Sequence, residues 1–137
     1  MTGGPEAMGA DVAADVVLEV GAAFTAYEAA LVANDVVAMN RWFRPGPSTC
    51  RFGIADVQSG YDEIVAWRRQ AAPVPPGRTL SGTSVVPLCP DVAVVTTCFS
   101  YPGRPVVGRQ SQVWLRTGDG WRIASAHVSE VPAVPAG

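Results

Sequence analysis

The second half of this chain is a series of strand-like segments joined by very short turns. Four runs rich in Val, Thr and aromatic residues are separated by three groups of Pro, Gly and Asp. Connections this short join antiparallel strands, because a parallel crossover needs about a dozen residues or more. The sequence therefore predicts an antiparallel meander with strands at residues 79–88, 92–101, 106–116 and 121–131.

The first half is predicted to be mostly helical. Apolar residues recur every three or four positions between residues 11 and 33, which is typical of an amphipathic helix. Asp35 can cap a short second helix that runs through Phe43, and a third helix is expected at residues 61–69. Three helices and a curved sheet give an α+β fold, in which we expect the first helix to lie across the concave face of the sheet.

One arginine lies inside an otherwise apolar segment. Residues 48–54 follow a Pro-Gly-Pro turn and are predicted to form a short strand with Arg51 at its centre. A guanidinium keeps its proton and is costly to bury without an anion. Its partner is either an acid of the chain, such as Glu28 or Asp35, or the carboxylate of a ligand, which the planar guanidinium suits better than lysine would.

The composition indicates a single domain, residues 1–137, with an ordered core at about 10–131 and flexible ends. Hydrophobic residues make up 48% of the chain, but no apolar run approaches the roughly 18 residues that a membrane span needs. No basic residue precedes Arg41, so no secretory signal is expected. We expect reduced core thiols in a cytoplasmic protein at all three cysteines, Cys50, Cys89 and Cys98.

Charge and the single histidine limit the partners. Residues 1–40 carry six acids and no base, whereas the rest carries ten arginines and six acids, for a net charge of −2. A net-acidic chain without basic clusters is not expected to bind nucleic acid, although a single arginine can still bind a small anion. His127 is the only histidine and no Cys-x-x-Cys motif occurs, so no metal is expected.

Five pieces of the chain, in order, match a known group of proteins. They are FTAYEAALVAND at residues 24–35, RFG at 51–53, GYDEI at 60–64, GRQSQVW at 108–114, and GWRI with AHVS at 120–129. With them the chain resembles the nuclear-transport-factor-2-like (SnoaL-like, cystatin-like) superfamily, and within it the AtzH/HpxZ-like branch. The resemblance implies a cone-shaped barrel of three N-terminal helices on a curved, mostly antiparallel sheet, a pocket at its open end, and a homodimer formed through the sheet's outer face.

The resemblance also implies a chemistry. The characterised activity of the branch is that of a decarboxylating amidohydrolase acting on 1,3-dicarboxyurea, and other members belong to oxalurate catabolism. The family's catalytic pair, a tyrosine on the first helix and an arginine on the first strand, corresponds to Tyr27 and Arg51. No cofactor is implied. Independently, Tyr27 shares a helical stripe with Phe24 and Leu31, so its hydroxyl should enter the interior and bind either a ligand or a backbone carbonyl.

Strand alternation supplies further candidates for substrate binding. Gln110, Gln112 and Trp114 share one face of the strand at 106–116, and Arg109 lies on the other. If Trp114 marks the interior, the two glutamines can hydrogen-bond a ureido group. Otherwise Arg109 lines the pocket as a second carboxylate clamp. Alternation alone leaves both possibilities open.

His127 is the last candidate for substrate binding, with a purely structural role as its alternative. It shares a face with Ile123 only if no bulge intervenes between them. Trp67 is expected to pack in the core or at the rim of the pocket.

Two other kinds of function stay open. One is a different enzyme on the same fold, such as an isomerase, cyclase or dehydratase, and the other is a non-catalytic ligand-binding or assembly module. Isomerase chemistry of the steroid type needs a carboxylate base in the cavity. The predicted strands carry acids only near their ends, at Asp91 and Glu130, which disfavours it.

Overall fold

The computed structural model describes residues 8–134. Its helices are α1 (Ala10–Ala33), α2 (Val36–Arg41) and α3 (Tyr61–Gln70). Its strands are β1 (Cys50–Phe52), β2 (Val57–Ser59), β3 (Thr79–Cys89), β4 (Val92–Ser100), β5 (Val106–Thr117) and β6 (Gly120–Pro132). The predicted flexible ends lie mostly outside the described residues.

The six strands form one mixed sheet in the order β2-β1-β6-β5-β4-β3. Strands β3 to β6 are the predicted antiparallel meander. β1 pairs in parallel with β6 and antiparallel with β2, a strand the sequence did not predict because it is only three residues long. The expected cone-shaped barrel is not closed: β2 and β3 are the two edges of the sheet, and no pairing joins them within the described residues.

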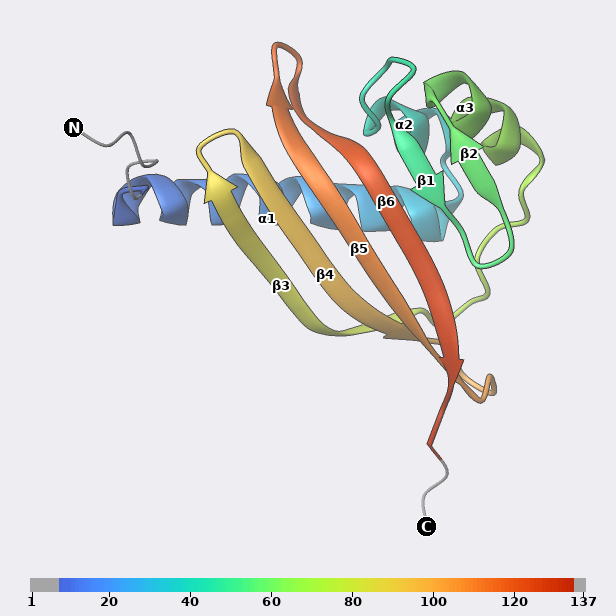
Figure 1. The fold of residues 1–137 in the computed structure, drawn as a ribbon. Coiled ribbons are helices and arrows are strands. Elements are labelled where there is room, and N and C mark those ends of the chain that lie inside the picture. The colour runs from blue at the N-terminus through green and yellow to red at the C-terminus, as the bar shows by residue number, and fades with distance from the viewer. Residues whose placement is uncertain (1–7, 135–137) are drawn as a thin grey trace.

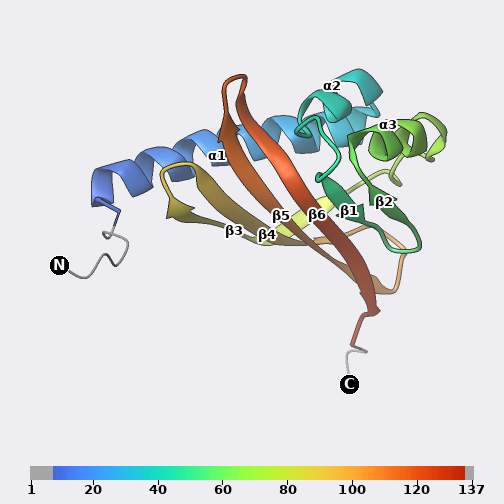
Figure 2. The ribbon, with the colours of Figure 1, turned by 45° about the horizontal axis from the view of Figure 1, so that its top comes forward.

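Helix α1 crosses the four long strands on one face of the curved sheet, as predicted (Figures 1 and 2). α2 and α3 lie beside β1 and β2, near the C-terminal end of α1 (Figure 1). The predicted apolar stripe of α1 is the buried side of this helix, and it packs with Trp114 and Ile123 of the sheet in one core. The buried residues of that stripe are Val16, Val20, Phe24, Tyr27 and Leu31, whereas Val17, which the predicted pattern also included, is 38% exposed.

Two consecutive residues, Asn34 and Asp35, end helix α1 and begin helix α2. Asn34 closes α1 in the left-handed conformation, at φ 53°, which Asn tolerates better than most residues. Asp35 then caps α2, its carboxylate accepting a hydrogen bond from the backbone N–H of Ala38 at 3.1 Å, as predicted. Asp35 is therefore not the partner of Arg51. α2 also ends at Arg41, two residues before the predicted end.

By length and composition alone, α1 is apolar enough to cross a membrane, with a mean hydropathy of 1.6 in its most apolar window. From the sequence, no segment was predicted to span a membrane. This helix was overlooked because Asp15, Glu19 and Glu28 interrupt its apolar residues. In the fold, the apolar residues of α1 that face the sheet are part of the core. The core helix of a globular domain can have the same length and apolar composition as a membrane-spanning helix.

The three cysteines are free but do not lie in the core. Each is half-buried. Cys50 and Cys98 belong to strands whose inward positions are occupied by their neighbours, and Cys50 lies 3.5 Å from the hydroxyl of Ser125. The prediction that these thiols lie in the core was wrong, because the hydrophobicity of a strand does not tell which of its faces is covered.

The packing of β4 on β5 gives a first test of this fold. Gly108 is buried, and a Cβ at this position would collide with the ring of Phe99. We expect Gly108→Ala to lower the free energy of unfolding by about 1–3 kcal/mol, the usual cost of overpacking a core, as measured by urea unfolding. Gly118→Ala is the matched control, because a Cβ there meets no atom within 4 Å. Equal stability of the two variants would contradict this packing.

Candidate functional site

A cavity of about 200 Å³ lies between the C-terminal half of α1, α3 and the inward face of the sheet. Its wall combines apolar side chains with polar groups that point inward, among them Tyr27, Arg51, Arg68 and Gln112. This volume is below the roughly 300–1,000 Å³ of sites for drug-sized molecules. The cavity therefore suits a ligand of a few heavy atoms that offers hydrogen-bonding groups in several directions.

Arg51 enters the cavity from β1, as the sequence predicted, and its side chain is 11% exposed. Its Nη1 donates to the carboxylate of Asp56 at 2.7 Å and to Oε1 of Gln58 at 2.9 Å. The internal ion pair that the sequence left open thus exists, with Asp56 rather than with Glu28 or Asp35. Within the described residues, Nη2 and Nε of Arg51 donate no hydrogen bond and are not sealed from solvent, so both can serve a ligand.

The pKa of Arg51 reflects a crowded cationic site. Burial lowers it, and the charge of nearby Arg68 lowers it further, while Tyr27 and Asp56 oppose both effects. Both guanidinium groups lie over the ring of Trp67, at 3.8 Å for Arg51 and 4.6 Å for Arg68. Trp67 is thus a cation–π platform for two arginines as well as a packing residue.

Tyr27 is 4% exposed and its ring packs edge-on against Phe43, with centroids 5.9 Å apart. Its hydroxyl oxygen accepts a hydrogen bond from Nη2 of Arg68 at 3.2 Å. Because the partner is a guanidinium, which only donates, the proton of the hydroxyl is left for another acceptor. Within the described residues no acceptor takes it, and the hydroxyl borders the cavity.

A second buried group of polar residues holds α1 against the sheet. Arg78, just before β3, donates through Nε to Glu28 at 2.8 Å and through Nη1 to the hydroxyl of Tyr101 at 2.8 Å. Gln110 joins them, donating through Nε2 to Glu28 at 3.1 Å and accepting from Arg78 at 3.1 Å. Burial alone lowers the pKa of Arg78, but the hydrogen bonds and charge of Glu28 outweigh burial and raise it overall.

The structure decides between the two faces of β5 that the sequence left open: the two glutamines point inward. Trp114 is fully buried, and alternation along β5 then buries Gln112 and Gln110 on the same face. Gln112 accepts a hydrogen bond from the indole N–H of Trp114 at 3.0 Å. Its amide NH₂ donates to no described residue, is not sealed from solvent, and borders the cavity.

Arg109 and His127 lie on the opposite, outer face of the sheet and do not belong to this cavity. Arg109 alternates with the buried glutamines on β5. His127 points outward because the β5–β6 register shifts next to Ile123, so that Ile123 and Ala126 both face inward. The ring of His127 packs against Phe52 instead, with centroids 5.9 Å apart. The proposal that either residue binds substrate in this cavity is therefore dropped.

The comparisons with known proteins agree with this architecture. The sequence model of the AtzH-like family matches residues 11–133. The chain belongs to the AtzH-like family.

Two solved structures are similar to this AtzH-like protein in sequence as well as in fold. A cystatin-like fold protein from Burkholderia xenovorans LB400 is 48% identical, with a TM-score of 0.84 over 88% of this chain and 95% of that one. A protein of unknown function from the DUF3225 family, from Pectobacterium atrosepticum SCRI1043, is 37% identical, with a TM-score of 0.85 over 91% and 99%.

More distant structures share the fold alone. A nuclear-transport-factor-2-like superfamily protein from Salmonella enterica serovar Typhimurium LT2 is 20% identical, with a TM-score of 0.67 over 90% of this chain and 95% of that one. No curated protein matches the AtzH-like chain.

Sequence reasoning missed several residues of the AtzH-like site. Arg68 was not among the predicted site residues, although it lies on α3 next to Trp67 and points inward. Asp56 and Gln58 were missed because β2 was missed, and pairing of β2 with β1 is what places Gln58 opposite Arg51. Glu130 was expected at a strand end, yet it borders the cavity beside Arg104.

The acids around the AtzH-like cavity are all engaged. Asp56 is paired with Arg51, Glu28 with Arg78, and Glu130 with Arg104 at 3.1 Å. Across residues 8–134, no group of three or more His, Cys, Asp and Glu side chains is arranged to hold a metal ion. The polar groups that the cavity presents to a ligand include guanidinium, phenol and amide groups.

The pair formed by Glu28 and Arg78 allows a direct test of the buried network. Both side chains are at most 10% exposed, so Glu28→Gln leaves an uncompensated buried cation. We expect this variant to lose about 3–5 kcal/mol in the free energy of unfolding, as is usual when one partner of a buried ion pair is removed.

Glu19→Gln is the matched control for this test. Glu19 also bonds an arginine, Arg116, but on the surface, and it accepts a hydrogen bond from the indole of Trp121 that a Gln oxygen can still accept. Removing its charge should therefore change the free energy of unfolding little. Chemical unfolding of both variants side by side measures the difference. A Glu28→Gln variant as stable as the parent would contradict the assigned role of the network.

Proposed function

We propose that this AtzH-like protein is a cofactor-independent small-molecule enzyme, a decarboxylating amidohydrolase acting on a carboxylated urea or an oxalurate-like small diacid. The observation that carries the proposal is the convergence, on one small cavity, of unused donors of Arg51, the hydroxyl of Tyr27 and the amide of Gln112. Membership in the AtzH-like family supports it, because the family's catalytic pair corresponds to Tyr27 and Arg51.

Binding comes first in the proposed mechanism. A carboxylate of the substrate accepts hydrogen bonds from Nη2 and Nε of Arg51, the two donors that the ion pair with Asp56 leaves free. The amide of Gln112 hydrogen-bonds the ureido group, and the apolar part of the wall excludes water. Holding the reacting bond beside Tyr27 removes much of the entropic part of the barrier.

The chemical step is proton transfer to nitrogen coupled to loss of carbon dioxide. The bond between nitrogen and its carboxylate carbon breaks, and the bonding electron pair stays on nitrogen, which takes the proton of the Tyr27 hydroxyl. The phenolate that forms lies beside the guanidinium of Arg68 and regains a proton from water. One N-carboxylate and one proton are consumed, and one neutral N–H group and one molecule of carbon dioxide are released, without ammonia. An oxalurate-like substrate instead requires hydrolysis: water attacks the carbonyl carbon, the C–N bond breaks, the leaving nitrogen takes the proton of Tyr27, and the attacking water returns a proton to the phenolate.

The alternative reactions fit this cavity less well. An isomerase of the steroid type requires a carboxylate that is free to take a proton. Asp56 and Glu130 border the cavity, but each already accepts hydrogen bonds from an arginine. A non-catalytic binding module would use the same cavity without consuming its ligand, so turnover is the property that separates it from the proposed enzyme.

Turnover is tested by carbon dioxide and ammonia release from 1,3-dicarboxyurea and from oxalurate. We expect the parent protein to act on at least one of them. Tyr27→Phe should lower kcat by about 10²–10⁴-fold, the usual contribution of a general acid, and Arg51→Met should abolish measurable turnover.

Two matched controls accompany these variants. Tyr61→Phe and Arg69→Met change the same residue types outside the cavity, and both should retain the activity of the parent. Full activity of Arg51→Met, or release of neither product by the parent, would contradict the proposed function.

We also propose that the protein is a homodimer formed through the outer face of the sheet, and that it is cytoplasmic. Apolar side chains on that face support the dimer, among them Val86 and Leu88 at the β3 edge and the half-buried Val113 on β5. Sedimentation velocity should give twice the mass of the chain for the parent, and Val113→Arg, which places a charge in the interface, should give a monomer. A monomeric parent would contradict the proposal.

A further inference from the structure

The charges around the cavity do not balance evenly. Four arginines border it, and three of them have a carboxylate partner within the described residues. The fourth, Arg68 on α3, forms no ion pair with any described residue, although it is only 7% exposed. A buried guanidinium without an anion is among the costlier features a fold can retain.

The hydrogen bonds of Arg68 are equally incomplete. One amino group, Nη2, donates to the hydroxyl of Tyr27 at 3.2 Å, whereas Nε is sealed from solvent and has no partner within the described residues. Stacking on Trp67 stabilises the cation in part, with 4.6 Å between the guanidinium carbon and the ring centroid. Neither contact supplies negative charge. The positive charge of Arg68 is therefore available to an anion from outside the chain.

Arg51, the expected carboxylate-binding residue, is less available as a source of charge. Asp56 already neutralises it through an ion pair of 2.7 Å. Arg51 retains free donors and can orient a bound oxygen, but the net positive charge of this part of the wall belongs to Arg68. Both guanidinium groups contact the Trp67 ring and border the same cavity, so both face the space in which a ligand would lie.

We propose that Arg68 is the principal anion-binding residue of this site, and that the carboxylate of the ligand lies between Arg68 and Arg51, next to the hydroxyl of Tyr27. The proposal rests on the proposed function for the kind of ligand, a small carboxylate, but it does not require turnover. It assigns Arg68 to affinity and charge selectivity, and Arg51 to orientation. Arg68 thereby determines the preference of the site for anionic over neutral ligands of the same shape.

The test uses malonate as the anionic probe and malonamide as its neutral counterpart, each titrated calorimetrically into the parent and into variants. We expect the parent to bind malonate at least 10-fold more tightly than malonamide. Arg68→Met should weaken malonate by about 10- to 100-fold, the range expected when a charged hydrogen-bonding partner is lost, and leave malonamide nearly unchanged. Arg68→Lys, which keeps the charge, should lose less than Arg68→Met.

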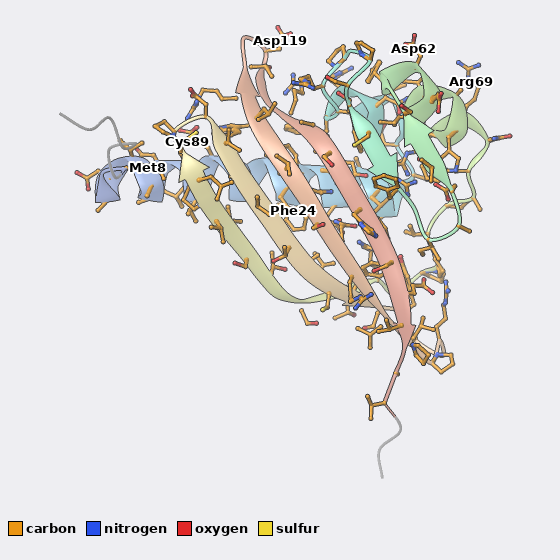
Figure 3. All side chains as sticks on the ribbon, in the orientation of Figure 1. Met8, Phe24, Asp62, Arg69, Cys89 and Asp119 are labelled. Carbon is orange, nitrogen blue, oxygen red and sulfur yellow. The ribbon has the colours of Figure 1, made fainter. Side chains whose placement is uncertain are left out.

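Arg69→Met is the matched control. Arg69 follows Arg68 on the same turn of α3, but it is exposed and points away from the sheet (Figure 3). Its removal changes the net charge by the same amount and should leave malonate binding unaltered. A thermal unfolding curve of each variant identifies any that is misfolded.

A crystal structure of the parent with malonate requires no variant and keeps the proposal testable if Arg68→Met does not fold. The proposal expects a carboxylate oxygen within hydrogen-bond distance of the Arg68 guanidinium. It is overturned if malonate contacts Arg51 alone, if Arg68→Met folds and binds malonate like the parent, or if the parent binds no malonate. The turnover assay is read separately: malonate binding through Arg68 without turnover of any diacid would contradict the proposed function and leave this assignment standing.

Discussion

Glu28, on the side of α1 that meets the sheet, accepts hydrogen bonds from Arg78 ahead of β3 and from Gln110 on β5. This contact joins three segments that are far apart in the sequence, and each partner satisfies a polar group that burial would otherwise penalise. The preceding residue, Tyr27, lies on the same side of α1, with its ring against Phe43 and its hydroxyl at the cavity. The geometry of the candidate site therefore depends on a helix whose position on the sheet is held in part by one carboxylate.

The cavity beside this contact shows how a small fold can keep several arginines out of water. The buried Arg51 and Arg78 are each paired with a carboxylate of the chain, and cation–π contacts with Trp67, Phe99 and Tyr101 add to the stabilisation of the buried charges. Electrostatic interactions are stronger in a partly dehydrated space than at the surface, so one uncompensated guanidinium has a large influence on what the cavity accepts. A small anion that also offers an acceptor to Tyr27 matches both requirements of the wall.

Much of the fold follows from local patterns that the sequence displays openly. The three-to-four spacing of apolar residues predicted α1, the acid at Asp35 predicted the start of α2, and short turns predicted the meander of β3 to β6. Strand β1 was predicted within residues 48–54, but its hairpin partner β2 was missed because its three residues contain too little pattern to recognise. The partner of Arg51 escaped for the same reason, since Asp56 lies in the turn of that hairpin.

The sequence by itself determined which residue types could do chemistry here: it singled out Tyr27 and Arg51, and it left Gln110, Gln112, Arg109 and His127 as candidates for substrate binding. It also determined the α+β class, because helix and strand periodicities are properties of neighbouring residues. Only the tertiary structure decided which face of the sheet is covered, and with it the separation of Gln112 from Arg109 and His127. It alone brought Arg68 to Tyr27, 41 residues away along the chain, because a contact of that kind depends on how α1 and α3 pack rather than on any local pattern.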